Sequence, residues 1–300
     1  MLDVSEVLRR HAVAAAAQSW LDGLPELVRD LERRWDLVVG RTLDGATEAF
    51  VAEAVTAGGR PVVLKLVLPQ GDGAAARHET TALRLGAGRG TVALLDADPH
   101  RGALLLERLG RPMIALGLPT GERHALLCDT VARVWRPAPG ADLPTGADRA
   151  RHLAAFVTQT WEDLGHPCSE RAVEHAVACA GRREAAHDDE RAVLVHGDVH
   201  QLNALEAGSG FRLVDPDGVL AEPECDLGTV MRGDPVDLLQ GDPVERAHRL
   251  AARTGTDPVA VWEWGVVERV ASGLHCTAIG LQPLGCQTLA AADAVAGLGA

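Results

Sequence analysis

The sequence is poor in lysine. Lys65 is the only one in 300 residues, and arginine makes up the other 28 of the 29 basic residues. Basic side chains are also outnumbered, because 42 acidic residues leave a formal net charge of −13. This charge argues against nucleic acid or an anionic membrane as a partner. It is compatible with a cationic small molecule as the substrate.

Long hydrophobic runs and closely spaced cysteine pairs are also missing. The N-terminal region carries Asp3 and Glu6, and its apolar run, Ala12–Ala17, is too short for a signal peptide or a transmembrane helix. The six cysteines form no Cys-x-x-Cys pair, which is typical of reduced core residues. With 47% hydrophobic and 24% charged residues, we expect a globular, cytoplasmic, monomeric protein.

Apolar periodicity divides the chain into a β-rich part and a helix-rich part. The first 35 residues predict helices, one of them opening at Pro25. Five strands follow, at Leu37–Val39, Ala49–Val55, Pro61–Leu68, Val92–Leu95 and Ala103–Glu107. A helix at Ala74–Leu85 separates the third strand from the fourth. Helices then dominate, at Thr120–Trp135, Asp148–Leu164, Ser169–Ala186, Pro243–Arg253, Asp257–Cys276 and from Cys286, with strands at Ala192–Val195 and Phe211–Val214. The predicted class is α+β, with an N-terminal lobe (1–109) and a mainly helical C-terminal lobe (110–300).

The densest group of polar residues follows the strand that ends at Val195. It reads His196-Gly-Asp-Val-His-Gln-Leu-Asn203, and the next strand is followed by Asp215. Phosphoryl transfer from a nucleotide needs such groups. Asp198 would accept the proton of a substrate hydroxyl, and Asn203 with Asp215 would hold Mg²⁺ against the phosphates.

Two other interpretations fit the same segment. In the first, the Asp and Asn side chains only satisfy the backbone of turns. In the second, His196, Asp198 and His200 alternate along a strand, share one face and bind zinc in a metallohydrolase.

Lys65 lies in the middle of the apolar strand Pro61–Leu68. A lysine on an edge strand can extend its amine into solvent, but arginine serves at every other basic position of this chain. A compact ammonium contacts phosphate oxygens as a point charge, which a planar guanidinium does not reproduce. We therefore predict that Lys65 contacts nucleotide phosphates. Glu79 on the following helix, or Glu53 on the neighbouring strand, would form an ion pair with it.

The order of these residues resembles the protein-kinase-like fold. More narrowly, the chain resembles the aminoglycoside/hydroxyurea antibiotic resistance kinases, which include streptomycin 6-phosphotransferases. The motifs that carry the resemblance run from about residue 20 to 230 and read Trp20-Leu-Asp-Gly-Leu-Pro-Glu-Leu27, Leu104-Leu-Leu-Glu-Arg-Leu109, Val195-His-Gly-Asp198, Val214-Asp-Pro-Asp-Gly218 and Glu224-Cys-Asp-Leu227.

The resemblance implies ATP and Mg²⁺ as cofactors and a role for each matching residue. Asp198 would be the catalytic base, and Asn203 and Asp215 the Mg²⁺ ligands. Lys65 would contact the phosphates, and Glu79 would support that lysine. The backbone from Glu107 to Leu109 would bind adenine. Asp226 would support the catalytic loop, and Asp217 would add a second metal contact or form a turn. Gly197 replaces the arginine with which protein kinases clamp a phosphorylated loop, which favours a small-molecule kinase.

The expected function is therefore phosphorylation of an aminoglycoside hydroxyl, with resistance to the antibiotic as the outcome. A wall of carboxylates for the cationic substrate is expected from Asp234, Asp237, Asp242, Glu263 and Glu268. Hydroxyurea or another small hydroxylated metabolite is the alternative substrate and needs no such wall. A catalytically silent nucleotide-binding regulator is the alternative from another class, because the Gly-rich phosphate loop is weak.

Overall fold

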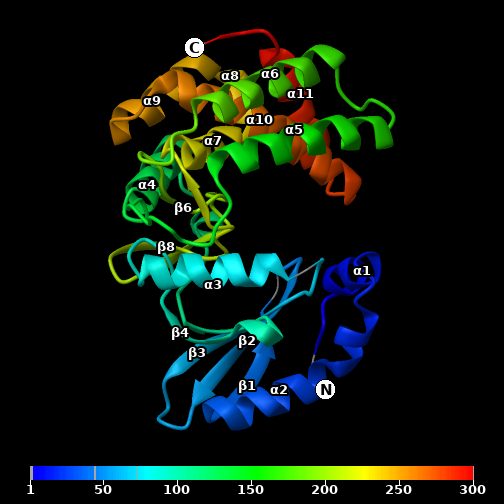
Figure 1. The fold of residues 1–300 in the computed structure, drawn as a ribbon, viewed down its shortest axis with the longest axis vertical. Helices are drawn as coiled ribbons and strands as arrows, with labels where there is room; N and C mark the ends of the chain where they lie inside the picture. The colour runs from blue at the N-terminus through cyan, green and yellow to red at the C-terminus, as the bar shows by residue number, and fades with distance from the viewer. Residues whose placement is uncertain (1–2, 44, 72, 300) are drawn as a thin grey trace. The chain divides into compact units, whose positions relative to one another are not determined.

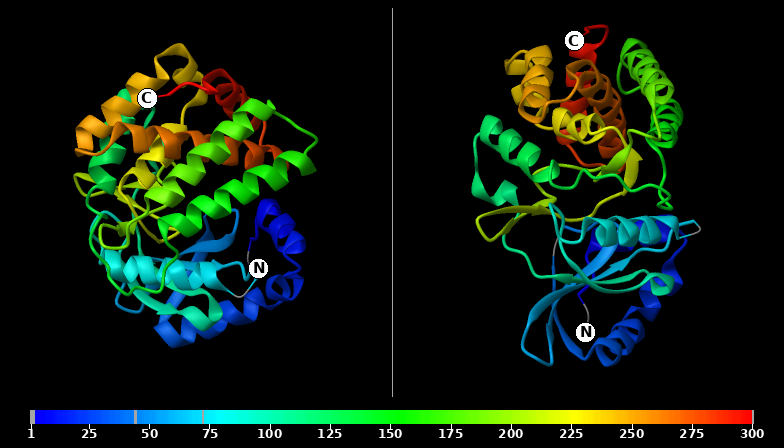
Figure 2. Two further views of the ribbon diagram at one scale, coloured as in Figure 1. Left: turned by 45° about the horizontal axis from the view of Figure 1, so that its top comes forward. Right: turned by 60° about the vertical axis from the view of Figure 1, so that its left-hand side comes forward.

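The computed structural model describes residues 3–43, 45–71 and 73–299. The chain divides into two compact units, Met1–Gly110 and Arg111–Ala300, and each has hydrophobic core clusters of its own. The ribbon views show a sheet with accompanying helices in the first unit and mostly helices in the second (Figures 1 and 2). This composition of elements confirms the predicted α+β class.

A five-stranded antiparallel sheet forms the centre of the first unit. Its strand order is β1-β2-β3-β5-β4, so that β3 is the middle strand. The elements of this unit are α1 (Glu6–Ala14), α2 (Gln18–Trp35), β1 (Leu37–Thr42), β2 (Ala49–Thr56), β3 (Pro61–Val67), α3 (Ala74–Gly86), β4 (Leu94–Asp98), η1 (Pro99–Arg101) and β5 (Ala103–Glu107).

Helix α2 covers one face of this sheet. Its buried apolar stripe and the sheet residues beneath it form one cluster that includes Leu21, Leu24, Val28, Leu31, Phe50, Ala52, Leu64 and Leu66. Successive side chains of a strand point to opposite faces. Lys65 lies between Leu64 and Leu66 in β3, and it therefore projects from the face opposite α2.

Several boundaries in this unit differ from the prediction, and β1 runs to Thr42 where an end at Val39 was expected. Pro25 lies inside α2 and does not open a helix. A proline in a helix removes one backbone hydrogen bond, and the burial of Leu24 and Val28, at about 1.5–3 kcal/mol per side chain, offsets that loss. The strand predicted at Val92–Leu95 is displaced toward the C-terminus, since β4 covers Leu94–Asp98.

The second unit packs its helices around α10, which contacts α5, α6, α7, α9 and α11. Among the helices that the structure describes, none combines the length and apolar character that crossing a bilayer requires. The elements of this unit are η2 (Met113–Leu116), α4 (Thr120–Val131), α5 (Gly146–Asp163), α6 (Glu170–Ala186), β6 (Val193–Val195), β7 (Ala204–Ala207), β8 (Gly210–Leu213), β9 (Val219–Ala221), α7 (Glu224–Arg232), α8 (Pro235–Gln240), α9 (Pro243–Thr254), α10 (Pro258–Ala278) and α11 (Leu284–Val295).

The hydrophobic pattern does not predict α7. Eight of its nine residues are buried, so the helix has no polar face and no amphipathic period to recognise. It packs so closely against α10 that a Cβ at Gly228 would overlap Trp264, and a Cβ at Gly265 would overlap Met231. This glycine crossing sets the register between the two helices, with Arg232 and Glu268 one turn further on.

Candidate active site

Lys65 and Glu79 form a buried ion pair in the first unit. The Lys65 Nζ lies 2.6 Å from Glu79 Oε1, and both side chains are only 8% exposed. Glu53, the other candidate partner, is engaged instead by Arg41 and Arg108. The predicted pairing of the lysine with the helix carboxylate is therefore confirmed. Contact of Lys65 with phosphates stays a prediction.

The predicted adenine-binding segment begins where β5 ends. The Glu107 backbone N–H donates to Ala93 O at 3.0 Å, and Glu107 Oε1 accepts from Ala93 N at 2.7 Å. These two bonds hold the end of β5 against the segment before β4. Leu109 follows as a half-buried residue outside any strand, and the role of both residues in nucleotide binding stays a prediction.

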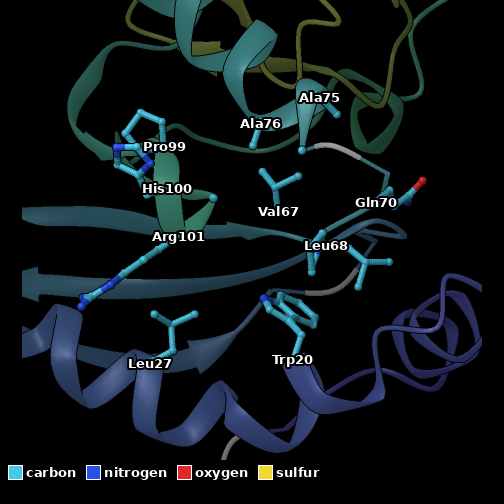
Figure 3. A pocket seen from close by; sticks show the side chains of 13 residues that line it. Trp20, Leu27, Val67, Leu68, Gln70, Ala75, Ala76, Pro99, His100 and Arg101 are labelled. Atoms are coloured by element: carbon cyan, nitrogen blue, oxygen red, sulfur yellow. The ribbon is translucent and has the colours of Figure 1, made fainter.

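A pocket of about 240 Å³ lies elsewhere in the first unit. Figure 3 shows Trp20 and Leu27 of α2 on one side of it, with Val67, Ala76 and the η1 turn on the other. Its described lining is mostly apolar and contains neither Lys65 nor any carboxylate. This pocket therefore does not supply the groups that phosphoryl transfer needs.

The predicted catalytic loop of the second unit connects β6 to β7 and is held by Asp226 of α7. Asp226 Oδ2 accepts from the backbone N–H of His196 at 2.9 Å and from Trp135 Nε1 at 2.8 Å, and Oδ1 accepts from Gly197 N at 2.7 Å. Asp226 is fully buried. The supporting contact that the resemblance implied for this residue is present. It fixes the start of the loop two residues before Asp198.

Three side chains converge on the carboxylate of Asp198. His200 Nε2 lies 3.0 Å from Oδ2, Asn203 Nδ2 donates to the same oxygen at 3.0 Å, and Arg232 donates to Oδ1. Burial by itself would raise the pKa of Asp198, but the charges of His200 and Arg232 outweigh it and hold the pKa well below its ordinary value. The side chain stays 30% exposed, so an ionised, oriented carboxylate is accessible.

Asn203 and Asp215 lie on adjacent segments of the same unit. The Val214 backbone N–H donates to Asn203 O at 2.9 Å, which ties the residue before Asp215 to the end of the catalytic loop. Asn203 directs its amide nitrogen toward Asp198, which leaves the amide oxygen as a candidate metal ligand. Asp215 is exposed and adopts a positive φ of 59°, a conformation that Asp tolerates better than most residues. Two hard oxygen donors suit Mg²⁺, which keeps several waters and takes phosphate oxygens as further ligands.

The zinc interpretation is not supported. Strand β6 ends at Val195, so the three residues of the proposed zinc site do not alternate along a strand. The ring of His196 is fully buried, with Nε2 2.9 Å from Val214 O and Nδ1 accepting from the backbone N–H of Asp198. Among the described residues there is no group of three or more His, Cys, Asp or Glu side chains that could hold a metal ion.

Asp217 and Gly197 meet at close range. Arg149 Nη1 lies 2.9 Å from Asp217 Oδ2, and a second metal contact by Asp217 stays a prediction. A Cβ at Gly197 would lie 2.9 Å from the Asp217 Cβ, and the φ of Gly197 is +91°, so only glycine fits there. Arg149 and Arg232 were missed by the sequence reasoning because no local pattern distinguishes them from surface arginines.

Each of the five residues expected in the carboxylate wall has an internal partner. Their partners are Arg123 for Asp234, Arg246 for Asp237, the α9 N-terminus for Asp242, Arg182 and Arg183 for Glu263, and Arg149 and Arg232 for Glu268. Glu263 and Glu268 are buried, so the wall is wrong for these two residues. Asp237 stays 52% exposed beside its arginine and Asp242 is also exposed, so for the other three residues the wall stays a prediction.

A family model and individual relatives of this chain point to the same protein family. Residues 34–280 match the model of the aminoglycoside/hydroxyurea antibiotic resistance kinases. The chain is 29% identical over 220 residues to a streptomycin 6-kinase of Streptomyces glaucescens, which covers 72% of this chain and 69% of that protein. It is 32% identical over 231 residues to a hydroxyurea phosphotransferase of Kitasatospora aureofaciens, covering 75% of this chain and 65% of that protein.

Solved structures show the same fold at low identity. An aminoglycoside phosphotransferase, APH(4)-Ia, in complex with ADP and hygromycin B matches with a TM-score of 0.58 and 14% identity, covering 91% of this chain and 99% of that one. A choline kinase of Cryptosporidium parvum matches with a TM-score of 0.61 and 9% identity, covering 90% and 93%. The protein-kinase-like fold expected from the motifs is therefore confirmed.

Proposed function

This chain belongs to the family of aminoglycoside/hydroxyurea antibiotic resistance kinases, and we propose that it phosphorylates a hydroxyl of a streptomycin-like aminoglycoside with ATP. It is a phosphotransferase with an alcohol group as acceptor. The phosphate adds about two negative charges at neutral pH, which opposes binding of the drug to an anionic target. We place the reaction in the cytoplasm, where ATP is available.

The observation that carries this proposal is the arrangement of the catalytic loop. Asp198 is ionised, partly exposed and held by three side chains. A substrate hydroxyl that donates to this carboxylate is oriented for attack on phosphorus. In a loose transition state the proton moves late, so orientation matters more than basicity.

The roles proposed for the nucleotide and metal contacts rest on which polar groups each unit presents. Lys65, kept charged beside Glu79, would contact the α- and β-phosphates, and the Glu107 and Leu109 backbone would bind adenine. Asn203 and Asp215 would hold Mg²⁺, which neutralises charge on the phosphates when bound. Lys65, Asp198, Asn203 and Asp215 are all present, which weighs against a catalytically silent nucleotide-binding regulator.

Hydroxyurea is the second candidate substrate, and one observation favours it. Three of the carboxylates expected to recognise a polycationic drug, Asp234, Glu263 and Glu268, are paired with internal arginines. A small neutral substrate needs no such carboxylates. A substrate panel distinguishes the two candidates.

The test is phosphate transfer to streptomycin, other aminoglycosides and hydroxyurea, with ATP or GTP and Mg²⁺, followed by mass spectrometry of the product. We expect Asp198→Asn to lower kcat by about 10²-fold or more, the usual loss for a general base, while circular dichroism shows an unchanged fold. Wild-type kcat in a folded Asp198→Asn enzyme would contradict the assigned role. Nucleotide binding without turnover on any acceptor would support the regulator.

A further inference from the structure

Five charged side chains of the second unit form a continuous chain of ion pairs. It runs from Asp217 through Arg149, Glu268 and Arg232 to Asp198. Arg149 Nη1 lies 2.9 Å from Asp217, and its Nη2 lies 2.7 Å from Glu268 Oε1. Arg232 Nη1 lies 2.7 Å from Glu268 Oε2, and its Nη2 contacts Asp198 Oδ1. The chain therefore connects the turn after Asp215 with the catalytic carboxylate.

Glu268 is the centre of this chain and is the most deeply buried member. Its side chain is 2% exposed, against 13% for Arg149 and 18% for Arg232. A buried carboxylate is tolerated when it is fully paired, and here each oxygen has its own arginine. The guanidinium of each arginine contacts both Glu268 and a second acid. Glu268 therefore fixes both arginines in one orientation.

The residues of this series of ion pairs lie on separate helices and loops. Their contacts therefore tie these segments to one another around Asp198. Arg149 lies on α5, Arg232 at the end of α7, and Glu268 on α10. Arg149 also donates to Gly197 O at 2.6 Å, directly before Asp198. The close crossing of α7 and α10 at Gly228 sets the register that brings Arg232 to Glu268.

We propose that Arg232 is a positioning residue for phosphoryl transfer, held by Glu268 and Arg149, which fixes the rotamer of the Asp198 carboxylate. The proposal rests on the proposed function of that loop. Arg232 donates to Oδ1 of Asp198, while His200 and Asn203 contact Oδ2. The carboxylate plane is thereby defined from both sides, and the substrate hydroxyl meets a single orientation of the base. Small misplacements of a reacting group cost large factors in rate.

A variant series tests this role, with the conservative exchange as rescue. Arg232→Gln removes the charge and the bidentate fork, and we expect kcat to fall roughly 10- to 10²-fold with the KM for ATP within about twofold of wild type. Arg232→Lys keeps the charge with one donor group, and its kcat should lie between the two. A folded Arg232→Gln enzyme with wild-type kcat would overturn the proposal.

Helix α10, which carries Glu268, also provides a matched control residue. Glu263 of α10 is also buried and also lies between two arginines, Arg182 and Arg183, but it makes no contact with the catalytic loop. Glu268→Gln and Glu263→Gln should lower the unfolding temperature similarly, and only Glu268→Gln should lower kcat. Equal kcat losses at an equal folded fraction would show a merely structural role and would overturn the proposal.

A crystal structure of the full-length Arg232→Gln protein separates this inference from the proposed function. A rotated Asp198 side chain, with His200 and Asn203 in place, would support the positioning role even if no acceptor in the panel were phosphorylated. An unmoved Asp198 would overturn the inference while leaving the phosphotransferase assignment intact.

Discussion

Lys65 keeps its ammonium group almost entirely out of water, at 8% exposure, by pairing with Glu79. A buried charge without a partner is strongly destabilising. The pair therefore holds the amine at a fixed place in β3, and its contact with an anionic ligand stays a prediction. An arginine there would keep the charge but would occupy more space and present a planar fork.

We expect Lys65→Arg to lower kcat/KM for ATP by roughly 10- to 10²-fold through displacement of the phosphate contact, while the protein still folds. Steady-state kinetics with varied ATP and thermal unfolding measure both effects. The matched control is Arg41→Lys, a conservative exchange at an ion pair whose arginine is 74% exposed, which should leave kcat/KM unchanged. Wild-type kinetics in Lys65→Arg would mean that the lysine has no special role.

Helices α7 and α10 meet through small residues, and this crossing supports the proposed catalytic loop. Gly228 has no room for a Cβ against Trp264. The same helix carries Asp226, which holds the backbone of the loop, and Arg232, which holds Asp198. A shift of α7 by a fraction of an ångström therefore reaches Asp198, the proposed catalytic base, through its side chain and through the backbone of the loop before it.

We expect Gly228→Ala to lower the free energy of unfolding by about 1–3 kcal/mol, the usual cost of overpacking a core, and to lower kcat as well. Gly181 in α6 provides the control, because nothing lies within 4 Å of a Cβ built there. Gly181→Ala should raise stability by roughly 0.5–1 kcal/mol, since glycine is unfavourable inside a helix. Urea titrations of both variants give the comparison, and a neutral Gly228→Ala would refute the tight crossing.

Elements with one buried face were predictable, and the short helix α7, which is buried on all sides, was not. The stripe of α2 and the alternation around Lys65 follow the usual periods of helix and strand. Helix α7 carries buried Glu224 and Asp226 among apolar residues, which hides its helical nature from any hydrophobic pattern.

For the molecule as a whole, a bound nucleotide should stabilise the folded chain. A ligand that binds only the native state raises stability by RT ln(1 + [L]/Kd), about 2.7 kcal/mol at a hundredfold excess over Kd. We expect a non-hydrolysable ATP analogue with Mg²⁺ to raise the unfolding temperature, and chelation of Mg²⁺ to remove most of that increase and all turnover.

Differential scanning fluorimetry of wild type and Asp215→Asn checks this expectation. The variant keeps the shape of the side chain and removes the charge of one proposed Mg²⁺ ligand, so the shift should shrink and become insensitive to chelation. A full, Mg²⁺-dependent shift in Asp215→Asn would argue against this residue as a ligand.

The sequence by itself determined the chemistry that this chain carries. A single lysine on an apolar strand, a loop with Asp198 and Asn203, and Asp215 after the next strand are local features, because each depends only on residue type and spacing. Fold class and family followed from their order along the chain.

Only the tertiary structure decided which charges meet. It chose Glu79 over Glu53 as the partner of Lys65, and it brought Arg232 to Asp198 across 34 positions of the sequence. It also placed three of the acidic side chains expected at the substrate site, Asp234, Glu263 and Glu268, in internal ion pairs. Pairings of this kind depend on helix register and close packing, which no periodicity in a single sequence records.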